Sequence, residues 1–354
     1  MSARLTPTTL AETGFAVLIG AAGAGVASRL GAPMPFLLGA FGASAMAALG
    51  RVAVVGISPV LPMGLRNLFV AVIGVAIGAA FSAEFAGRMW DHRFAVLGIP
   101  VFVAAALLVN FAIFRRIGGY DRPTAFFAAM PGGLIESIAM GERAGCDARI
   151  LGLQQFSRIA LVITVLPTLF LIFTGEQVGS AAGMTLEGAR PGVTGSDALI
   201  LLGAAIFGQA GGRALRLPAG ILVGPLILSA LGHLGGWTAA VPPAWLVAAA
   251  QVVVGAGLGG RFAGFPPRLL LRTFGLAVLS VTAMLALDAA LVLLLAPLTG
   301  LPFDVLLISF APGGVTETAL IALSLDANPA FVTMMHVFRI IGTVLAGALV
   351  ARRL

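Results

Sequence analysis

The sequence predicts an all-α polytopic membrane protein made of two inverted repeats, each with about five transmembrane helices and one broken or re-entrant segment. Three observations predict this class. Of the 354 residues, 59% are hydrophobic and only 10% are charged, which is too little charge to cover the surface of a soluble domain. Apolar segments long enough to cross a bilayer recur along the chain. Motifs of the first half return in the second half.

The expected membrane spans form two sets of five. Helices are expected because only a helix satisfies its own backbone hydrogen bonds in lipid within a segment of this kind. We divide the chain into a first membrane repeat at 1–174, an external linker at 175–195 and a second membrane repeat at 196–354. The expected spans lie near 12–28, 32–50, 64–83, 94–114, 150–174, 196–212, 217–236, 243–260, 273–296 and 330–350.

The duplication is visible in motifs separated by fixed offsets. MPGGLIES at 130–137 returns as APGGVTET at 311–318, and we call this spacing the motif offset. The motif offset also places Gly74 on Gly255 without a gap. Nearer the N-terminus, LGAPMPFLLGA at 30–40 resembles LRLPAGILVGP at 215–225, a slightly larger spacing that we call the N-terminal offset. The two halves are therefore copies of one ancestral unit.

Arginine placement predicts the orientation of the spans. With five crossings in each half, the halves are inverted, and both termini lie on the cytoplasmic side of the membrane. This arrangement places 15 of the 21 basic residues in cytoplasmic loops and tails and four outside, as the positive-inside rule requires. If the Pro-Gly-Gly segments crossed the membrane fully, each half would have six crossings and the halves would be parallel.

Each Pro-Gly-Gly motif predicts a helix that breaks inside the membrane. Proline cannot continue the preceding helix, and two glycines permit a tight turn. The helix that follows then presents unpaired N–H groups and the positive end of its dipole. Broken helices of this kind often form solute sites in transporters. The structural alternative is a kinked helix whose glycines serve close packing.

Polar and ionisable residues accompany both motifs at matching positions. Such groups are costly in hydrocarbon and usually line a pathway or pair with each other. A glutamate there binds a cation, relays a proton or pairs with an arginine, and an arginine pairs with glutamate or meets an anion. Asp288 and Asn110, which also lie in expected spans, are weaker candidates for pathway residues. The predicted solute- or ion-binding residues are Gly132, Gly133, Glu136, Gln155, Arg158, Gly313, Gly314, Glu317, His336 and Arg339.

The two PGG-x-x-E segments, each followed by an arginine at the same spacing, resemble the AbrB membrane-protein family, which is described as an AbrB duplication. The resemblance covers nearly the full chain. It implies a bacterial inner-membrane protein, and members are labelled regulators of gene expression or ammonia monooxygenases. The positions that match are Pro131, Gly132, Gly133, Glu136, Arg158, Pro312, Gly313, Gly314, Glu317 and Arg339.

The function that we predict is transport of a small solute between the inverted repeats, with an organic anion and proton coupling favoured. The alternative is a membrane sensor that acts indirectly on gene expression. A monooxygenase ranks last, because the sequence has one cysteine and three widely spaced histidines, so we expect no enzyme activity, metal or cofactor. The expected partners are the lipid bilayer, a small solute, protons and a second copy or another protein. Direct nucleic-acid binding is not expected.

Overall fold

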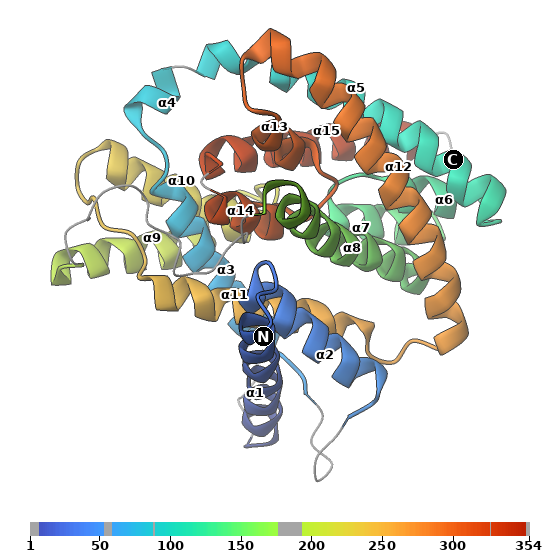
Figure 1. The fold of residues 1–354 in the computed structure, drawn as a ribbon, viewed down its shortest axis with the longest axis horizontal. Coiled ribbons are helices and arrows are strands. Elements are labelled where there is room, and N and C mark those ends of the chain that lie inside the picture. The colour runs from blue at the N-terminus through green and yellow to red at the C-terminus, as the bar shows by residue number, and fades with distance from the viewer. Residues whose placement is uncertain (1–6, 53–58, 88, 176–192, 326, 352–354) are drawn as a thin grey trace. The chain divides into compact units, whose positions relative to one another are not determined.

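The computed structural model describes residues 7–52, 59–87, 89–175, 193–325 and 327–351. Within these residues every regular element is a helix (Figure 1), which confirms the predicted all-α class. Most of the predicted external linker and both predicted cytoplasmic termini lie outside the described residues. The chain forms two compact units: unit 1 is Met1–Ala80, Pro167–Phe265 and Leu323–Asp326, and unit 2 is Phe81–Leu166, Pro266–Ala322 and Ala327–Leu354. Each unit therefore draws on both halves of the sequence.

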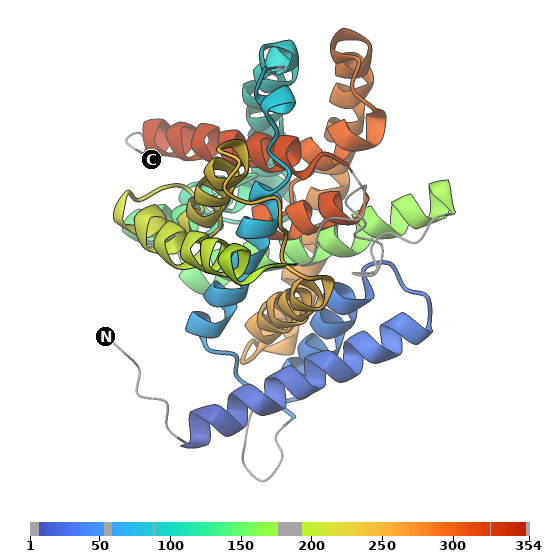
Figure 2. The same cartoon turned by 90° about the vertical axis from the view of Figure 1, so that its left-hand side faces the viewer.

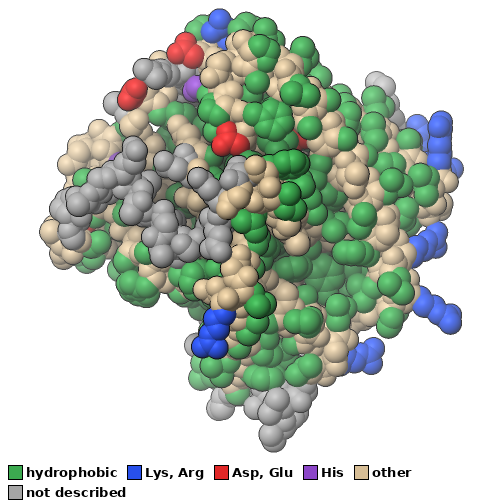
Figure 3. Space-filling model, in the orientation of Figure 1, with side chains coloured by type: hydrophobic (Ala, Val, Ile, Leu, Met, Phe, Trp, Pro, Cys, Tyr) green, Lys and Arg blue, Asp and Glu red, His purple; other side chains and the backbone are tan. Residues whose placement is uncertain are grey.

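Several helices have the length and composition of membrane spans. Hydrophobic side chains cover much of the face seen in Figure 3, and Leu108, Phe207 and Leu349 are among the large hydrophobic residues that are exposed. Exposed apolar surface on this scale is what lipid contact requires. Six helices among the described residues are long and apolar enough to cross a bilayer: Thr9–Arg29, Trp90–Ile117, Ala148–Phe173, Ala244–Phe262, Pro267–Thr299 and Pro329–Val350.

Three of the expected spans are shorter than predicted. The segments at 32–50, 64–83 and 217–236 contain the apolar helices Pro35–Leu49, Met63–Gly78 and Gly220–Leu234. The first and third begin only after a left-handed residue, Met34 or Ala219, and the second begins after Pro62. A helix of this length reaches about 23 Å at a rise of 1.5 Å per residue, which is less than the roughly 30 Å hydrocarbon thickness.

Unit 1 contains the helices of the N-terminal part of each repeat. From the first repeat they are α1 (Pro7–Arg29), the π-helical turn η1 (Pro35–Gly39), α2 (Ala40–Leu49) and α3 (Met63–Gly78). From the second repeat they are α9 (Gly195–Ala214), α10 (Gly220–Leu234), α11 (Ala244–Gly259) and η5 (Gly260–Phe262). In this unit α10 packs on α3 and α9, and α11 packs on α2 and α3 (Figure 2).

Unit 2 contains the remaining helices of both repeats. The first repeat supplies α4 (Ala83–Gly87), η2 (Met89–His92), α5 (Arg93–Ala112), η3 (Ile113–Ile117), α6 (Arg122–Ala129), α7 (Leu134–Arg143) and most of α8 (Ala148–Thr174). The second repeat supplies α12 (Pro267–Thr299), α13 (Phe303–Phe310), most of α14 (Val315–Ser324) and α15 (Pro329–Ala351). Here α5 packs on α6, α12 and α15.

The backbone repeats at the same offsets as the sequence. The motif offset relates both the first and the last residues of α6 to those of α13, of α7 to those of α14, and of α3 to those of α11. Left-handed backbone repeats as well, because Met34 (φ 44°) corresponds to Ala219 (φ 49°) at the N-terminal offset. Gly119 (φ 67°) corresponds to Gly300 (φ 65°) at the motif offset. The duplication is therefore present in the helix boundaries and in the turns.

The two repeats contact each other reciprocally within unit 1. A Cβ atom added to Gly74 would lie 2.5 Å from the carbonyl oxygen of Leu222. A Cβ added to Gly255 would overlap the carbonyl oxygen of Leu37. Because Gly255 matches Gly74 and Leu222 matches Leu37, these are the same contact with the repeats exchanged. Two copies that are related by a two-fold axis make reciprocal contacts of this type.

In unit 2, the matched helices α5 and α12 run antiparallel. A Cβ on Gly98 would lie 2.8 Å from Cδ1 of Leu295, so these two residues are in contact. Further along α5, Asn110 Oδ1 accepts a hydrogen bond of 2.7 Å from Ser280 Oγ. Beyond α5, the Gly118 carbonyl accepts one of 2.6 Å from Arg272 Nη2. Residue numbers rise on one helix as they fall on the other.

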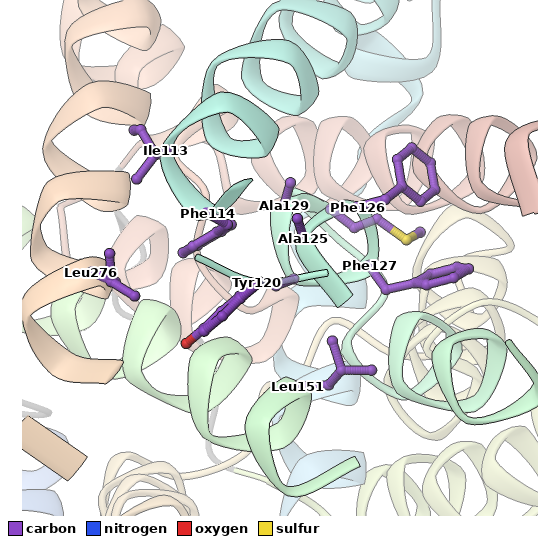
Figure 4. Close-up of a cluster of buried hydrophobic side chains, with 11 residues drawn as sticks. Ile113, Phe114, Tyr120, Ala125, Phe126, Phe127, Ala129, Leu151 and Leu276 are labelled. Atoms are coloured by element: carbon purple, nitrogen blue, oxygen red, sulfur yellow. The ribbon is translucent and has the colours of Figure 1, made fainter. Parts of the chain in front are cut away.

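A hydrophobic cluster holds α6 in the interior of unit 2. Figure 4 shows Phe126 and Phe127 of α6 among side chains from α8 and α12, including Leu151 and Leu276. At the start of α6, the Asp121 carboxylate caps the helix by accepting from the Thr124 N–H at 3.4 Å. The buried cluster therefore fixes the opposite, C-terminal end of α6, where the first Pro-Gly-Gly motif begins.

Candidate functional site

Each Pro-Gly-Gly motif separates two short helices, as the sequence predicts. Helix α6 ends at Met130, which is extended (φ −62°, ψ 121°), and α7 starts after Gly133 in the left-handed region (φ 64°). Helix α13 ends in the same way at Ala311 (φ −50°, ψ 134°), before α14. Met130 and Ala311 are both fully buried, so each helix leaves its last carbonyl groups in the protein interior.

The two predicted arginines reach these carbonyl groups. Arg158 Nη1 on α8 donates to the Met130 carbonyl, and Arg339 Nη1 on α15 donates to the equivalent carbonyl of Ala311. Arg339 also donates to the carbonyls of Phe310 at 3.0 Å and Gly313 at 2.9 Å. A guanidinium is favourable at the negative end of a helix dipole. Both arginines therefore act as caps of the broken helices.

Gln155 and His336 occupy matching positions beside these caps. Gln155 Nε2 donates to the Phe127 carbonyl at 3.1 Å, and His336 Nε2 donates to the equivalent Ile308 carbonyl at 2.9 Å. The other ring nitrogen, Nδ1, lies 2.9 Å from Arg339 Nη2. Because a guanidinium only donates, His336 Nδ1 must accept, and the ring is neutral in this arrangement.

The two predicted glutamates lie on the opposite side of each break, in the first turn of α7 and α14. A Cβ added to Gly133 would lie 3.3 Å from Glu136 Oε2, and a Cβ added to Gly314 would overlap Glu317 Oε2. Each carboxylate therefore folds back over the glycine at the positive end of its helix dipole. Glu317 is 4% exposed, whereas Glu136 is partly exposed. The Nη groups of both arginines bind backbone carbonyls.

Each break packs on the last long helix of the other repeat. A Cβ on Gly132 would lie 3.6 Å from Ile340 Cα and 3.3 Å from Thr343 Oγ1, both on α15. A Cβ on Gly313 would lie 3.2 Å from Val162 Cγ1 on α8. Val162 corresponds to Thr343, so this contact is also reciprocal.

Three buried donors near the crossing of these segments make no hydrogen bond within the described part of the chain. They are Arg158 Nε, Arg339 Nε and Thr343 Oγ1. The space left by the missing side chain of Gly132 adjoins two of them, because its Cβ would lie 3.7 Å from Arg339 Nε and 3.3 Å from Thr343 Oγ1. The sequence analysis missed Thr343. The signal that reveals it is the difference from Val162 in the other copy.

Comparison with known proteins decides the family. The family model described as "Transition state regulatory protein AbrB" matches residues 41–354. The chain belongs to the AbrB family. This confirms the resemblance that the repeated motifs indicate.

Two relatives of this AbrB-family chain match most of its length. It is 28% identical over 348 residues to "Uncharacterized protein YhjN" of Bacillus subtilis (strain 168), covering 92% of this chain and 88% of the relative. It is 25% identical over 300 residues to "Putative regulator AbrB" of Escherichia coli (strain K12), covering 84% of each chain. Among the residues that the structure describes in this AbrB-family member, His, Cys, Asp and Glu side chains form no group of three or more able to hold a metal.

Proposed function

We propose that this AbrB-family membrane protein binds and transports a small solute at the two broken helices of unit 2, and that the solute is an anion. The observation that carries the proposal is the pair of unpaired, buried donors beside Gly132, Arg339 Nε and Thr343 Oγ1. The guanidinium Nη atoms are already used by the helix ends. A small anion accepts hydrogen bonds from both remaining donors, whereas a cation is repelled by the guanidinium charge.

The helix arrangement supports an inverted repeat and hence alternating access from the two sides of a bacterial inner membrane. The matched helices α5 and α12 make antiparallel contacts. A two-fold axis perpendicular to the helices places matched helices in this way. The reciprocal contacts of both units support the same axis. Transporters built from inverted repeats commonly place the solute at discontinuous helices near the bilayer midplane.

Accessibility of matched positions tests the inversion. In a Cys146→Ala background, Arg122→Cys and Phe303→Cys place single thiols on the exposed first residues of α6 and α13. We expect a membrane-impermeant maleimide to label the thiol at 303 in intact cells and the thiol at 122 only in inverted vesicles. Labelling of both from one side of the membrane would contradict the inverted arrangement.

A single methyl group tests the solute site. We expect Gly132→Ala to weaken anion binding by at least about tenfold, equivalent to about 1.4 kcal/mol, because the new Cβ fills the space beside Arg339 Nε and Thr343 Oγ1. Binding of nitrate, formate, acetate and lactate to purified protein is measured by calorimetry, followed by uptake into proteoliposomes. The control is Gly275→Ala on α12, whose Cβ would meet nothing within 4 Å. Unchanged affinity in Gly132→Ala would remove this site from the proposal.

A regulatory function is the second candidate, because the family description and the Escherichia coli relative both carry that label. A membrane sensor would bind the same solute and pass the signal to a protein partner, without direct contact to nucleic acid. Transport and sensing differ in one measurement. A sensor binds the anion in detergent but gives no protein-dependent uptake in proteoliposomes, whereas a transporter does both.

A further inference from the structure

We infer that only the first of the two broken helices binds the proposed anion, and that two pairs of matched side chains, each differing by a single chemical group, decide this. The inference rests on the proposed function above and deepens it, because it assigns one anion per chain to a duplicated fold. We call Pro131–Gly133 with its contacts on α15 the first break, and Pro312–Gly314 with its contacts on α8 the second break.

The first pair is Thr343 and Val162, which match at the motif offset and have nearly the same shape. A Cβ on Gly132 would lie 3.3 Å from Thr343 Oγ1, and a Cβ on Gly313 would lie 3.2 Å from Val162 Cγ1. A methyl group therefore stands at the second break where a hydroxyl group stands at the first. Because a methyl group cannot donate a hydrogen bond, the second break offers an anion one donor fewer.

The second pair is Ser137 and Thr318, which match at the same offset and differ by one methyl group. Thr318 Cγ2 would lie 2.6 Å from a Cβ on Gly313, so this methyl group already occupies the space beside that glycine. The three atoms nearest to a Cβ on Gly132 all belong to α15, at 3.3 Å or more. The Ser137 hydroxyl instead donates to the Leu134 carbonyl at 3.1 Å. Space is therefore left at the first break and filled at the second.

The glutamates that follow the two breaks differ in the same direction. Glu317 Oε2 would overlap a Cβ on Gly314, and the Glu317 side chain is 4% exposed. Glu136 Oε2 would lie 3.3 Å from a Cβ on Gly133, and Glu136 is partly exposed. The first turn of α7 is thus less enclosed than that of α14, as access of a solute requires.

The arginine donor is the part of the site that both breaks share. Arg339 Nε and the matching Arg158 Nε are each buried, and neither makes a hydrogen bond to a described residue. Each guanidinium also caps the end of a broken helix through Nη1. The arginines therefore do not distinguish the two breaks, and the difference rests on the two pairs above. A hydroxyl group gained and a methyl group removed at the second break should complete a second site there.

Exchange of the two pairs tests the inference through the number of anions bound per chain. Equilibrium dialysis of the purified full-length protein against isotope-labelled nitrate, formate, acetate and lactate gives this number together with the affinity. We expect the wild type to bind one anion per chain. Val162→Thr combined with Thr318→Ser copies the composition of the first break into the second, and this double variant should bind two.

The reverse exchange shows where each anion binds. Thr343→Val combined with Ser137→Thr should weaken binding by at least about tenfold, because one donor is lost and a methyl group enters the space beside Gly132. All four substitutions together should restore one anion per chain, now held at the second break. Gly132→Ala should then leave the affinity of this quadruple variant unchanged, although it weakens binding by the wild type.

The matched control makes the same two types of change elsewhere in unit 2. Val281→Thr combined with Thr273→Ser alters two buried residues of α12 and should keep one anion per chain with the wild-type affinity. Size-exclusion profiles show which variants are folded. If the double variant of the second break is not folded, the reverse exchange tests the same pairs, and an unchanged affinity there overturns the inference.

The possible numbers of bound anions separate this inference from the proposed function. If the wild type binds two anions per chain, or if the folded Val162→Thr, Thr318→Ser variant still binds one, the inference is overturned while the anion site at Gly132 stands. If the wild type binds none of the four anions, the anion site and this inference both fail.

Discussion

Replacing Arg339 by alanine is expected to destabilise the protein by roughly 2 kcal/mol or more, because each buried acceptor left without a donor costs about 1–3 kcal/mol. The carbonyl groups of Phe310 and Gly313 lose the donor Arg339 in this variant, and the carbonyl of Ala311 keeps only the Gly313 N–H. Thermal unfolding of the purified protein in detergent measures the effect.

Two further variants show whether capping is the cause. Arg158→Ala should be less destabilising, because Arg158 donates to the single carbonyl of Met130 while Gln155 still binds Phe127. Arg339→Lys should recover only part of the lost stability. An ammonium lacks the planar, forked donors with which a guanidinium binds several carbonyl groups at once. An unfolding temperature of Arg339→Ala equal to that of the wild type would refute the capping role.

Two neighbouring glycines of α9 should respond to the same substitution with opposite signs. A Cβ on Gly212 would overlap the Gly220 carbonyl of α10, so Gly212→Ala must force the two helices apart. Overpacking of this kind typically costs about 1–3 kcal/mol, and here the obstructing atom is backbone, so we expect the upper end of that range. A Cβ on Gly211 would meet nothing within 4 Å. Gly211→Ala should therefore stabilise the helix by up to about 1 kcal/mol.

Unfolding temperatures of these two variants, measured side by side in one detergent, provide the comparison. Each variant adds one methyl group at adjacent positions of α9, so helix propensity is the same for both. The expected difference between them is several degrees, with the wild type between. Equal unfolding temperatures would show that the close approach of α9 to α10 contributes nothing to stability.

The amino-acid sequence by itself determined the membrane class, the duplication and the broken helices. Composition and helix-length apolar segments are local properties that no tertiary contact can reverse. The duplication supplied a second, independent copy of each motif, so Pro131 and Pro312 predicted the same break twice. The sequence singled out Arg158 and Arg339 because a guanidinium within a membrane span must find a partner, and both contact the carbonyl groups at a break.

Only the tertiary structure decided which partners these residues have. The arginine contacts join residues well separated in the chain and end on backbone carbonyls, which carry no signature in the sequence. The reciprocal packing of the repeats, and with it the role of Thr343 beside Gly132, depends on contacts between segments from opposite halves of the chain. Met34 and Ala219 shorten two of the expected spans by adopting left-handed backbone, which non-glycine residues enter only when surrounding packing compensates for the strain. Local chemistry thus specified where the helices break, and long-range packing specified what the breaks contact.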